Sequence, residues 1–459
     1  MSNEPRSLTV EAIPVLARER AGAGLWLDEA GARTWREFGA TVEAARRLCV
    51  AAGLRPGAVV VTSGEATLES LAWLFGAAAT GAVVAPLRRE RAGEIETWKK
   101  SIGIGWRVQN GHVVRVGEGT PSAAAVKLFG ELQARGHPGL ILATGGTTGT
   151  PKLVLHDLTT LLATVPVKAG RGWRILPLMR FDHIGGLDAA WRALAGGQVL
   201  VAPPAELTPG AVAAAIARHH VEVLPATPSF LNLLLLAGIE RTHELGSLRV
   251  VPYGAEPMPA GLLERLRAAL PRVEFVQRFG TSETGTLPVQ AAGAGLVLRD
   301  DQSGFAWKVV NEELWVRSPA RGLGYLAGDS GQLETSGWFR TGDFAEQLPD
   351  GAVRILGRRS DLINVGGEKV LPGGVEDVLL AHPLVTDCRV YPVPSAVLGQ
   401  MVAAEVVWRG EERDALAVKR LLHAFAGTSL PKSHLPAVVR LVGAIDTTRN
   451  LKKVRTAHP

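Results

Sequence analysis

Residues 144–152, with the sequence TGGTTGTPK, are of the types that bind phosphate, and they follow the apolar run at 140–143. Glycines let backbone N–H groups approach an anion, threonine hydroxyls donate further hydrogen bonds, and a lysine adds positive charge. The stretch is not a Walker-type loop, because Thr150 and Pro151 separate the last glycine from Lys152. The pattern predicts an anion-binding loop after a strand, although a flexible surface turn can have the same composition.

Two further stretches place a carboxylate in a polar turn. In FGTSETG, at 279–285, Glu283 stands beside hydroxyl side chains after an expected strand, where it could hold Mg²⁺ while the hydroxyls contact phosphate. In WFRTGD, at 338–343, Asp343 could accept hydrogen bonds from two ribose hydroxyls. Either stretch could equally be an ordinary turn. The segment TRNLKKVR, at 448–455, is by composition a basic tail of the kind that is usually solvated.

The composition is that of a globular chain with more than one domain. The 459 residues are 46% hydrophobic and 20% charged, and the net charge is +6 without a dense basic run. An anionic small molecule therefore explains the charge more simply than nucleic acid. Cys49 and Cys388 lie far apart, which fits a reducing, cytoplasmic location without a disulfide framework. The charged first twenty residues argue against a signal peptide. The longest apolar stretch, 71–87, is broken by glycine and proline, so we expect no membrane contact.

Helical and strand patterns alternate through most of the chain, which predicts parallel α/β sheets with helices on their faces. Helices are expected at 37–52, 68–79, 211–220 and 262–269. Strands are expected at 58–62, 82–85, 199–201, 221–224 and 273–276.

After about residue 303 the pattern becomes rich in strands, which are expected at 307–310, 313–316 and 353–356. A last segment combines helices at 375–381 and 415–426 with strands at 389–393 and 402–408. We place the main boundary near 357–360, which gives an N-terminal domain of residues 1–357 and a C-terminal domain of residues 358–459.

The order of the motifs carries more information than any one of them. The phosphate loop is followed by FDHIGG at 181–186, GAEP at 254–257, FGTSE at 279–283, RTGD at 340–343, GRRSD at 357–361 and a terminal lysine. This series resembles the adenylate-forming superfamily of acyl-CoA synthetases, peptide-synthetase adenylation domains and luciferases, over nearly the whole chain. The resemblance implies an α/β fold: a large N-terminal AMP-binding domain of two α/β sheet units plus a β-barrel-like unit, and a small mobile α+β C-terminal lid domain. It also implies an active site in the cleft between the two domains.

The resemblance assigns roles to individual residues. Lys452 is the catalytic lysine, His183 borders the carboxylate site, Glu283 is the Mg²⁺ ligand, and Ser360 is the hinge. The ATP phosphates are assigned to Thr144, Gly145, Gly146, Thr147, Thr148, Gly149, Lys152 and Ser282. Adenine and ribose are assigned to Gly254, Ala255, Glu256, Phe279, Gly280, Thr281, Asp343 and Arg358. The tunnel for the pantetheine arm of CoA is assigned to Gly366, Gly367 and Glu368.

The chain departs from the family pattern at six places: Gly145 replaces a serine, Leu153 a glycine, Phe279 a tyrosine, Ser282 a threonine, Ser360 an aspartate and Leu451 a glycine. The last departure leaves Lys453 as the alternative to Lys452.

The implied function is that of an ATP-dependent carboxylic acid–CoA ligase. The acid and ATP would form acyl-AMP and pyrophosphate, and CoA would then give acyl-CoA and AMP. Mg²⁺ would assist, and the enzyme would be a monomer or a homodimer. The residues at 357–363 and 366–368 resemble those of o-succinylbenzoate and aryl-acid CoA ligases, which implies an aromatic or medium-sized acid, such as o-succinylbenzoate or a benzoate-type acid. One alternative is a free-standing adenylation enzyme that loads a carrier protein or an amine. Another is a non-catalytic nucleotide sensor.

Overall fold

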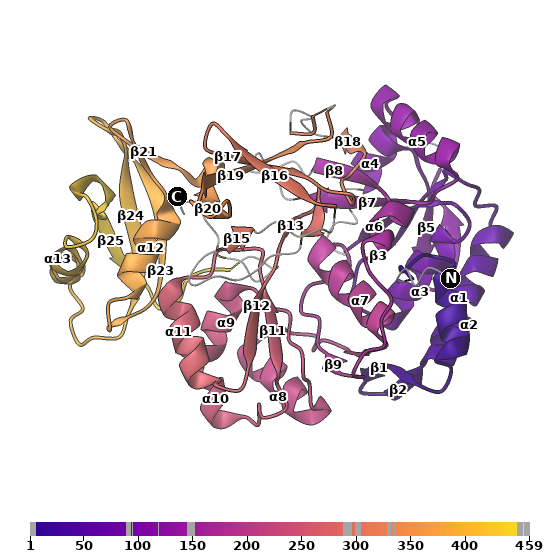
Figure 1. Ribbon diagram of the computed structural model, residues 1–459, viewed down its shortest axis with the longest axis horizontal. Helices are drawn as coiled ribbons and strands as arrows, with labels where there is room; N and C mark the ends of the chain where they lie inside the picture. The colour runs from indigo at the N-terminus through magenta and orange to yellow at the C-terminus, as the bar shows by residue number, and fades with distance from the viewer. Residues whose placement is uncertain are drawn as a thin grey trace.

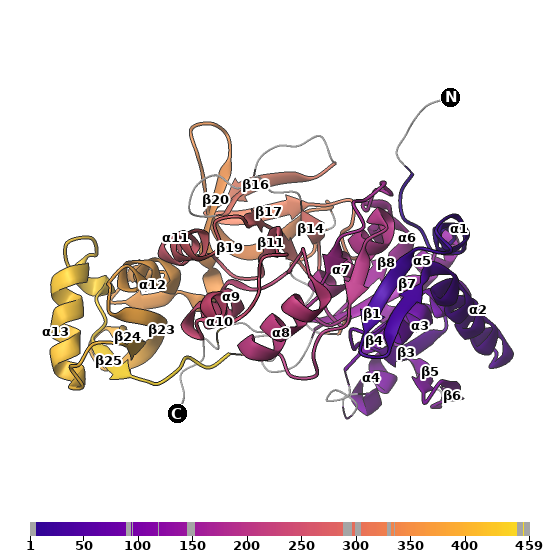
Figure 2. The same cartoon turned by 90° about the horizontal axis from the view of Figure 1, so that it is seen from below.

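The computed structural model describes residues 6–88, 93, 95–117, 119–144, 152–287, 296–298, 304–327, 332–334, 336–447 and 453. The helices α1 (Ala12–Glu19) and α2 (Trp35–Ala51) lie at one end of an elongated molecule, and the C-terminal part of the chain forms a separate unit at the other end (Figures 1 and 2). None of the helices in the described ranges is long and apolar enough to cross a membrane.

A seven-stranded sheet forms the core of the first unit, in the order β18-β8-β7-β4-β3-β5-β6. Its strands are β3 (Val59–Ser63), β4 (Val83–Leu87), β5 (Ile104–Gln109), β6 (His112–Arg115), β7 (Gly139–Thr144), β8 (Lys152–Asp157) and β18 (Gly324–Ala327). The central strands are parallel, as the alternating pattern predicts, whereas β6, β8 and β18 pair antiparallel at the two edges.

Both faces of this sheet are buried, which explains its nearly continuous apolar strands. On one face Val60 and Val84 join a core that includes α2, α3 (Leu68–Ala78), α6 (Leu158–Ala163) and α7 (Ile184–Gly196). On the other face Val61 and Val83 pack with side chains of α4 (Ile95–Ile102) and α5 (Ala123–Arg135).

A second sheet forms the other α/β unit. It contains β1 (Gly24–Asp28), β2 (Gly31–Thr34), β9 (Arg174–Ile175), β10 (Val199–Val201), β11 (Val250–Tyr253) and β12 (Glu274–Gln277). The prediction of a strand at 221–224 is wrong. Of these four residues only Val223 forms β-bridges, one to Ile175 and one to Val250. Pro225 follows directly and has no N–H with which to extend a ladder. Helices pack with this sheet: α8 (Pro209–His219), α9 (Pro228–Leu236), α10 (Ile239–Thr242) and α11 (Ala260–Ala269).

The strand-rich part after residue 303 forms a five-stranded antiparallel sheet in the order β15-β20-β19-β17-β16. Its strands are β15 (Leu296–Leu298), β16 (Ala306–Val310), β17 (Glu313–Arg317), β19 (Phe339–Gln347) and β20 (Val353–Arg358). A short hairpin of β13 (Phe279–Thr281) and β14 (Gly285–Leu287) lies next to it in the chain, and Phe279 packs against its core.

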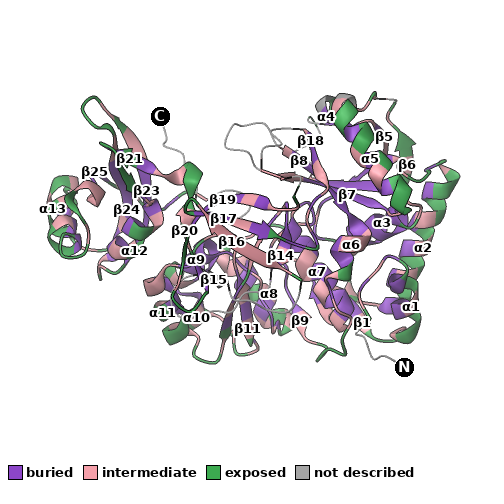
Figure 3. Ribbon diagram, turned by 45° about the horizontal axis from the view of Figure 1, so that its top comes forward, coloured by how far each residue is buried: buried purple, intermediate pink, exposed green. Residues whose placement is uncertain are grey.

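The last part of the chain forms a small α+β unit with its own core (Figure 3). Its elements are β21 (Ile363–Val365), β22 (Glu368–Val370), α12 (Pro372–Leu380), β23 (Val385–Ser395), β24 (Gly399–Trp408), α13 (Ala415–Ala426) and β25 (Val438–Leu441), with 3₁₀ turns η2 (Arg359–Asp361) and η3 (Lys432–His434). The bounds predicted for α13 from the sequence, 415–426, are confirmed. By contrast, α2 begins at Trp35 and not at 37, because Thr34 and Glu37 form a capping box.

Candidate active site

The phosphate loop connects two antiparallel strands. Thr144 ends β7 and pairs with Lys152 at the start of β8, so the ladder closes the base of the loop. Five of the candidates lie outside the described residues: Gly145, Gly146, Thr147, Thr148 and Gly149. Leu153, at the position of the usual glycine, is buried in β8.

Lys152 lies in a polar cluster with residues that are remote in sequence. Its Nζ donates to Gln332 Oε1 at 3.1 Å and lies 5.4 Å from the centre of the Tyr325 ring. The Tyr325 hydroxyl is 3.0 Å from Glu283 Oε1 and 3.3 Å from Gln332 Oε1. The cation of the phosphate loop and the predicted metal ligand therefore meet through Tyr325, which sequence reasoning missed. Only the pairing of β18 with β8 brings Tyr325 to this position.

Glu283 stands in the turn of the β13–β14 hairpin and is 9% exposed. The hairpin is tight, because a Cβ on Gly280 would overlap the carbonyl oxygen of Gly285, and Gly285 itself has φ +71°. His156 of β8 stabilises the turn through a hydrogen bond, since its Nε2 lies 2.6 Å from the carbonyl oxygen of Ser282. Burial lowers the pKa of His156, so this imidazole is neutral and donates its Nε2 proton to that carbonyl. His156, too, was missed from sequence.

This donor set fits a magnesium ion that is carried by a nucleotide. Mg²⁺ in nucleotide sites is usually held by one or two carboxylates together with substrate phosphates, not by a cage made of protein alone. The described residues contain no group of three or more histidine, cysteine, aspartate or glutamate side chains that could form such a cage. Glu283, with Lys152 close by, supplies the single carboxylate that this mode of binding requires.

Asp343 and Arg358 face each other across the β19–β20 ladder. Arg358 Nε lies 2.7 Å from Asp343 Oδ1, and the Asp343 N–H donates to Thr341 Oγ1 at 3.0 Å. Burial raises the pKa of Asp343 to about 6, although Arg358 opposes this shift. Its Oδ2 is buried and makes no hydrogen bond in the described part of the chain. A ribose hydroxyl could donate to that oxygen, so the geometry fits the role predicted from sequence.

The segment 254–256 follows β11. A Cβ on Gly254 would overlap the carbonyl oxygen of Arg278, so only glycine fits beside the start of β13, and Ala255 has φ +68°. Glu256 Oε2 accepts hydrogen bonds from the Ser229 hydroxyl at 2.6 Å and from the Ser229 N–H at 3.2 Å. The segment is therefore fixed against the start of α9.

His183 is the N-cap residue of α7 and is half-buried. The following Gly186 is required, because a Cβ there would overlap the carbonyl oxygens of Met179 and Arg180. The loop before α7 is held by an ion pair between Arg88 and Asp182, whose Nε and Oδ2 atoms lie 2.6 Å apart. His183 is thus presented on an anchored loop at the start of a helix.

The predicted hinge and tunnel residues make local contacts. Ser360 lies in η2, is exposed and donates to Asp361 Oδ1 at 2.9 Å. Gly366 and Gly367 form the exposed turn between β21 and β22, with φ of +60° and +96°. Glu368 accepts a hydrogen bond from Ser433 of η3. Among the described contacts, none joins this turn to Glu283 or Asp343, so the described part of the chain does not bring the tunnel candidates together with these two residues.

Of the two candidate lysines in the C-terminal motif, the structure describes one. Lys452 lies outside the described residues. Lys453 is described, and its side chain is 9% exposed and paired with Asp387, with Nζ and Oδ1 2.8 Å apart. The assignment of Lys452 as the catalytic lysine stays a prediction.

Two family models match the chain and together cover more than half of it. The model "AMP-binding enzyme" matches residues 115–326, and "AMP-binding enzyme C-terminal domain" matches residues 374–452. The chain belongs to the adenylate-forming, AMP-binding enzymes, as the order of the motifs predicts.

Several curated proteins resemble part of the chain. The 4-coumarate–CoA ligase 2 of Oryza sativa subsp. japonica is 29% identical over 58% of this chain and 52% of its own length. An L-proline–[L-prolyl-carrier protein] ligase of Pseudomonas fluorescens is 31% identical over 61% of this chain and 59% of its own. A 2-succinylbenzoate–CoA ligase of Bacillus cereus is 30% identical over 64% of each chain. The matches thus span about half to two thirds of the relatives' own lengths.

Solved structures match over nearly the whole chain at lower identity. The anthranilate CoA ligase AuaEII, in complex with anthranoyl-AMP, superposes with a TM-score of 0.80 at 18% identity and covers 99% of this chain and 97% of that chain. The amide bond synthetase McbA of Marinactinospora thermotolerans superposes with a TM-score of 0.74 at 21% identity and covers 97% and 98%. These likenesses confirm the fold: an α/β molecule with a large N-terminal and a small C-terminal domain.

Proposed function

We propose that the protein is an ATP-dependent carboxylic acid–CoA ligase that forms an acyl-adenylate and passes the acyl group to the thiol of CoA. The observation that carries the proposal is that one chain contains two groups of side chains, one suited to a triphosphate and the other to a ribose. Lys152 and Glu283 both lie beside Tyr325, which brings a cation for phosphate and a carboxylate for a metal ion close together. Asp343 offers a buried oxygen atom and is paired with Arg358, as a ribose requires.

The first half-reaction needs no covalent bond to the protein. A carboxylate oxygen of the acid attacks the α-phosphorus of ATP, the bond from that phosphorus to the β-phosphate oxygen breaks, and pyrophosphate leaves. Lys152 would counter the charge on the departing phosphates, and Lys452 would counter charge that builds between the acid and the α-phosphate. Bound Mg²⁺, held by Glu283 and phosphate oxygens, would neutralise further charge on the triphosphate.

In the second half-reaction the CoA sulfur attacks the acyl carbonyl, AMP leaves, and the thiol proton passes to solvent. The turn of Gly366 and Gly367 would line the path of the pantetheine arm, because residues without side chains let a thin chain pass close to the backbone. The turn is exposed in this structure, and Ser360 lies just before it in the chain. We therefore expect the small domain to rotate at Ser360 between the two half-reactions.

For the acid we favour an aromatic or medium-sized carboxylic acid, such as o-succinylbenzoate or a benzoate-type acid. Two relatives named as ligases of 4-coumarate and 2-succinylbenzoate support this choice, as does the fold likeness to an anthranilate ligase. The carrier-protein ligase and the amide bond synthetase support a second candidate, an adenylation enzyme whose acceptor is a carrier protein or an amine.

Pyrophosphate exchange tests the first half-reaction on a panel of aryl, dicarboxylic, fatty and amino acids. We expect exchange with an aryl acid, and a thioester when CoA is added. The Lys452→Ala variant should lose about 10²- to 10³-fold in exchange while it still forms thioester from supplied acyl-adenylate. Exchange without thioester would favour the carrier or amine acceptor. No exchange with any acid would reject adenylation and favour a nucleotide sensor. Full activity of Lys452→Ala with loss in Lys453→Ala would show that the lysine register is wrong.

A further inference from the structure

The C-terminal segment contacts both domains through one residue. The Lys453 N–H donates to Glu256 Oε1 at 2.7 Å, and Glu256 belongs to the segment after β11 in the large domain. The Lys453 ammonium lies 2.8 Å from Asp387 Oδ1 and donates to the carbonyl oxygen of Cys388 at 2.7 Å, both on β23 of the small domain. Lys453 therefore ties the small domain to the segment predicted to line the nucleotide and acid site.

The ammonium lies in a group of charges, which we call the junction cluster: Lys453, Asp387, Glu376, Asp377 and Arg265. Within it Asp387 and Glu376 are buried, whereas Asp377 is exposed. All but Asp377 line a small cavity of about 30 Å³ between the domains. Burial by itself lowers the pKa of Lys453, but Glu376 and Asp387 more than offset this, so that its pKa is raised and the ammonium stays charged.

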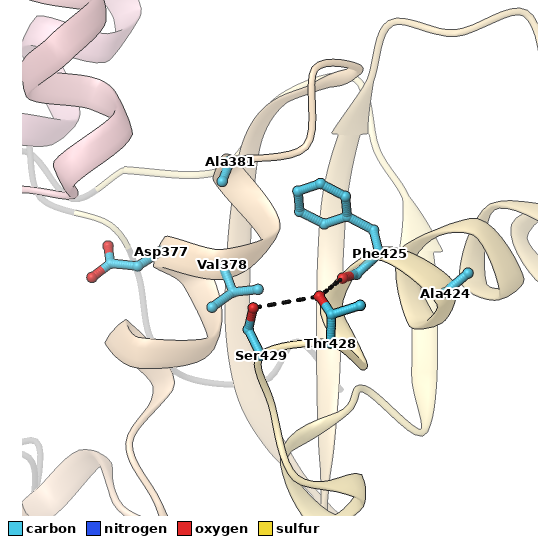
Figure 4. Close-up of a pocket in the computed structure, with 7 residues that line it drawn as sticks. All are labelled: Asp377, Val378, Ala381, Ala424, Phe425, Thr428 and Ser429. Carbon is cyan, nitrogen blue, oxygen red and sulfur yellow. Dashed lines mark hydrogen bonds between the residues drawn. The ribbon is translucent and has the colours of Figure 1, made fainter.

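Asp377 lies between the junction cluster and a nearby groove. A cavity of about 500 Å³ lies between α12 and α13, and Asp377 stands at its edge. Figure 4 shows the Asp377 carboxylate pointing away from Phe425, Thr428 and Ser429. Partial loss of solvent and the neighbouring carboxylate of Glu376 together raise the pKa of Asp377 to about 6, against the opposing effect of Lys453. Without Lys453 the carboxylates would lack this cation, which is costly for the two that are buried, Glu376 and Asp387.

Lys453 also pairs with a residue that lies a few positions earlier in the chain. Thr447 and Lys453 form an isolated antiparallel bridge across residues 448–452. Lys452 directly precedes Lys453, and consecutive Cα atoms are about 3.8 Å apart. The anchor of Lys453 therefore limits where Lys452 can be presented, whatever the conformation of the residues between the two ends.

We infer that Lys453 is a positioning residue for the first half-reaction: its ammonium, held by Asp387 and the Cys388 carbonyl, and its N–H, held by Glu256, fix the terminal segment so that Lys452 is delivered to the nucleotide site. The inference rests on the proposed function. It also gives the two lysines different roles, because the Lys453 ammonium is already engaged by the protein. For the second half-reaction the contact with Glu256 must break when the small domain rotates, whereas the pair with Asp387, which lies within the small domain, can persist.

The test compares both half-reactions in Lys453→Met, Asp387→Asn and the double variant. Asp387→Asn is the milder change, since it keeps the shape of the side chain and the acceptor for the Cys388 N–H. We expect each single variant to lose up to about 10²-fold in pyrophosphate exchange, the size of loss caused by a small misplacement of a catalytic group. Thioester formation from supplied acyl-adenylate should be unchanged. The double variant should lose no more than Lys453→Met, because both changes act on the same ion pair, which Lys453→Met already abolishes.

The control is Lys369→Met. Lys369 of the small domain pairs with Glu312 of the large domain at 3.5 Å, but the two side chains are 59% and 71% exposed. An exposed pair contributes little, so this variant should retain wild-type exchange. Equal losses in both half-reactions of Lys453→Met would mean a merely structural role and overturn the inference, as would unchanged exchange. Absence of exchange in the wild-type protein with every acid would overturn the proposed function, and the inference with it.

Discussion

At the scale of single residues, the candidate site depends on side chains whose partners come from distant parts of the chain. Asp343 and Arg358 were both predicted from sequence, and they face each other across one ladder. Glu283 and Lys152 were predicted as well, but the residue that connects them, Tyr325, was not. A tyrosine in a short strand carries no motif of its own. Only its position beside β8 gives it a role.

Asp343 should make nucleotide binding depend on pH. Its pKa of about 6 is above the ordinary value, so the folded protein favours the neutral carboxyl: that stabilisation is complete below the ordinary pKa and is lost as the pH rises through about 6. Ribose hydroxyls bind best to the ionised form. We therefore expect the Kd for ATP, measured by calorimetry, to increase by as much as about tenfold for each pH unit below 6.

The matched variant for this measurement is Asp343→Asn, which cannot ionise. Its ATP affinity should be weaker at pH 8 and flat between pH 5 and pH 8. A wild-type profile that is equally flat would remove Asp343 from the ribose site.

Glu283→Gln should reduce magnesium-dependent turnover by about 10²-fold, because the amide keeps the shape but loses the charge that attracts the metal. Melting temperature should change little, since the Tyr325 hydroxyl can still donate to the amide oxygen. The comparison is Glu346→Gln, an exposed glutamate of β19 that pairs with Arg354 at 2.9 Å. Turnover titrated against Mg²⁺ checks this, and wild-type behaviour of Glu283→Gln at limiting Mg²⁺ would refute the assigned role.

At the scale of elements, the site depends on how tightly short turns are built. The β13–β14 hairpin presents Glu283 only because Gly280 approaches the backbone at Gly285. His156 then ties the turn to β8, the strand that also carries Lys152. Two sequence motifs that are more than a hundred residues apart are therefore held by one edge of the first sheet.

Gly280→Ala should destabilise the protein by about 2 kcal/mol or more, because the added methyl group meets backbone that cannot move aside. Gly130→Ala is the matched control: Gly130 lies in the exposed interior of α5 with open space around it. Alanine there should stabilise the protein by about 0.5–1 kcal/mol. Urea unfolding of both variants gives the comparison, and equal stabilities would show that the hairpin is looser than described.

At the scale of the whole molecule, the proposed reaction requires two arrangements of the domains, and the structure describes one. In it the terminal segment touches Glu256, while the turn of Gly366 and Gly367 stays exposed. These two observations fit an arrangement suited to the first half-reaction.

Ser360→Pro should therefore affect the two half-reactions unequally. Proline fixes φ near −65° and so restricts the dihedral changes that a hinge must make. We expect pyrophosphate exchange to be retained and thioester formation from acyl-adenylate and CoA to be suppressed. Pre-steady-state measurement of each half-reaction checks this. Wild-type rates in both would mean that the domains do not pivot at Ser360.

The family, the α/β class and some of the helices and strands could be predicted from the sequence, because these follow from local composition, periodicity and motif order. The bounds of α13, for instance, could be predicted from its amphipathic pattern alone. The sequence also indicated Glu283, Asp343, Arg358 and Lys152, since each lies in a short motif with a chemical meaning.

Tertiary structure alone decided which residues support those candidates. The contacts of His156 with Ser282, of Tyr325 with Glu283 and of Lys453 with Asp387 join residues that are between 42 and 126 positions apart in the chain. Such contacts arise from the pairing order of strands and from the packing of the small domain on the large one, and neither leaves a periodic signal in the sequence. For the same reason Lys453 reads as part of a basic tail in the sequence, whereas in the fold it is a buried cation among three carboxylates.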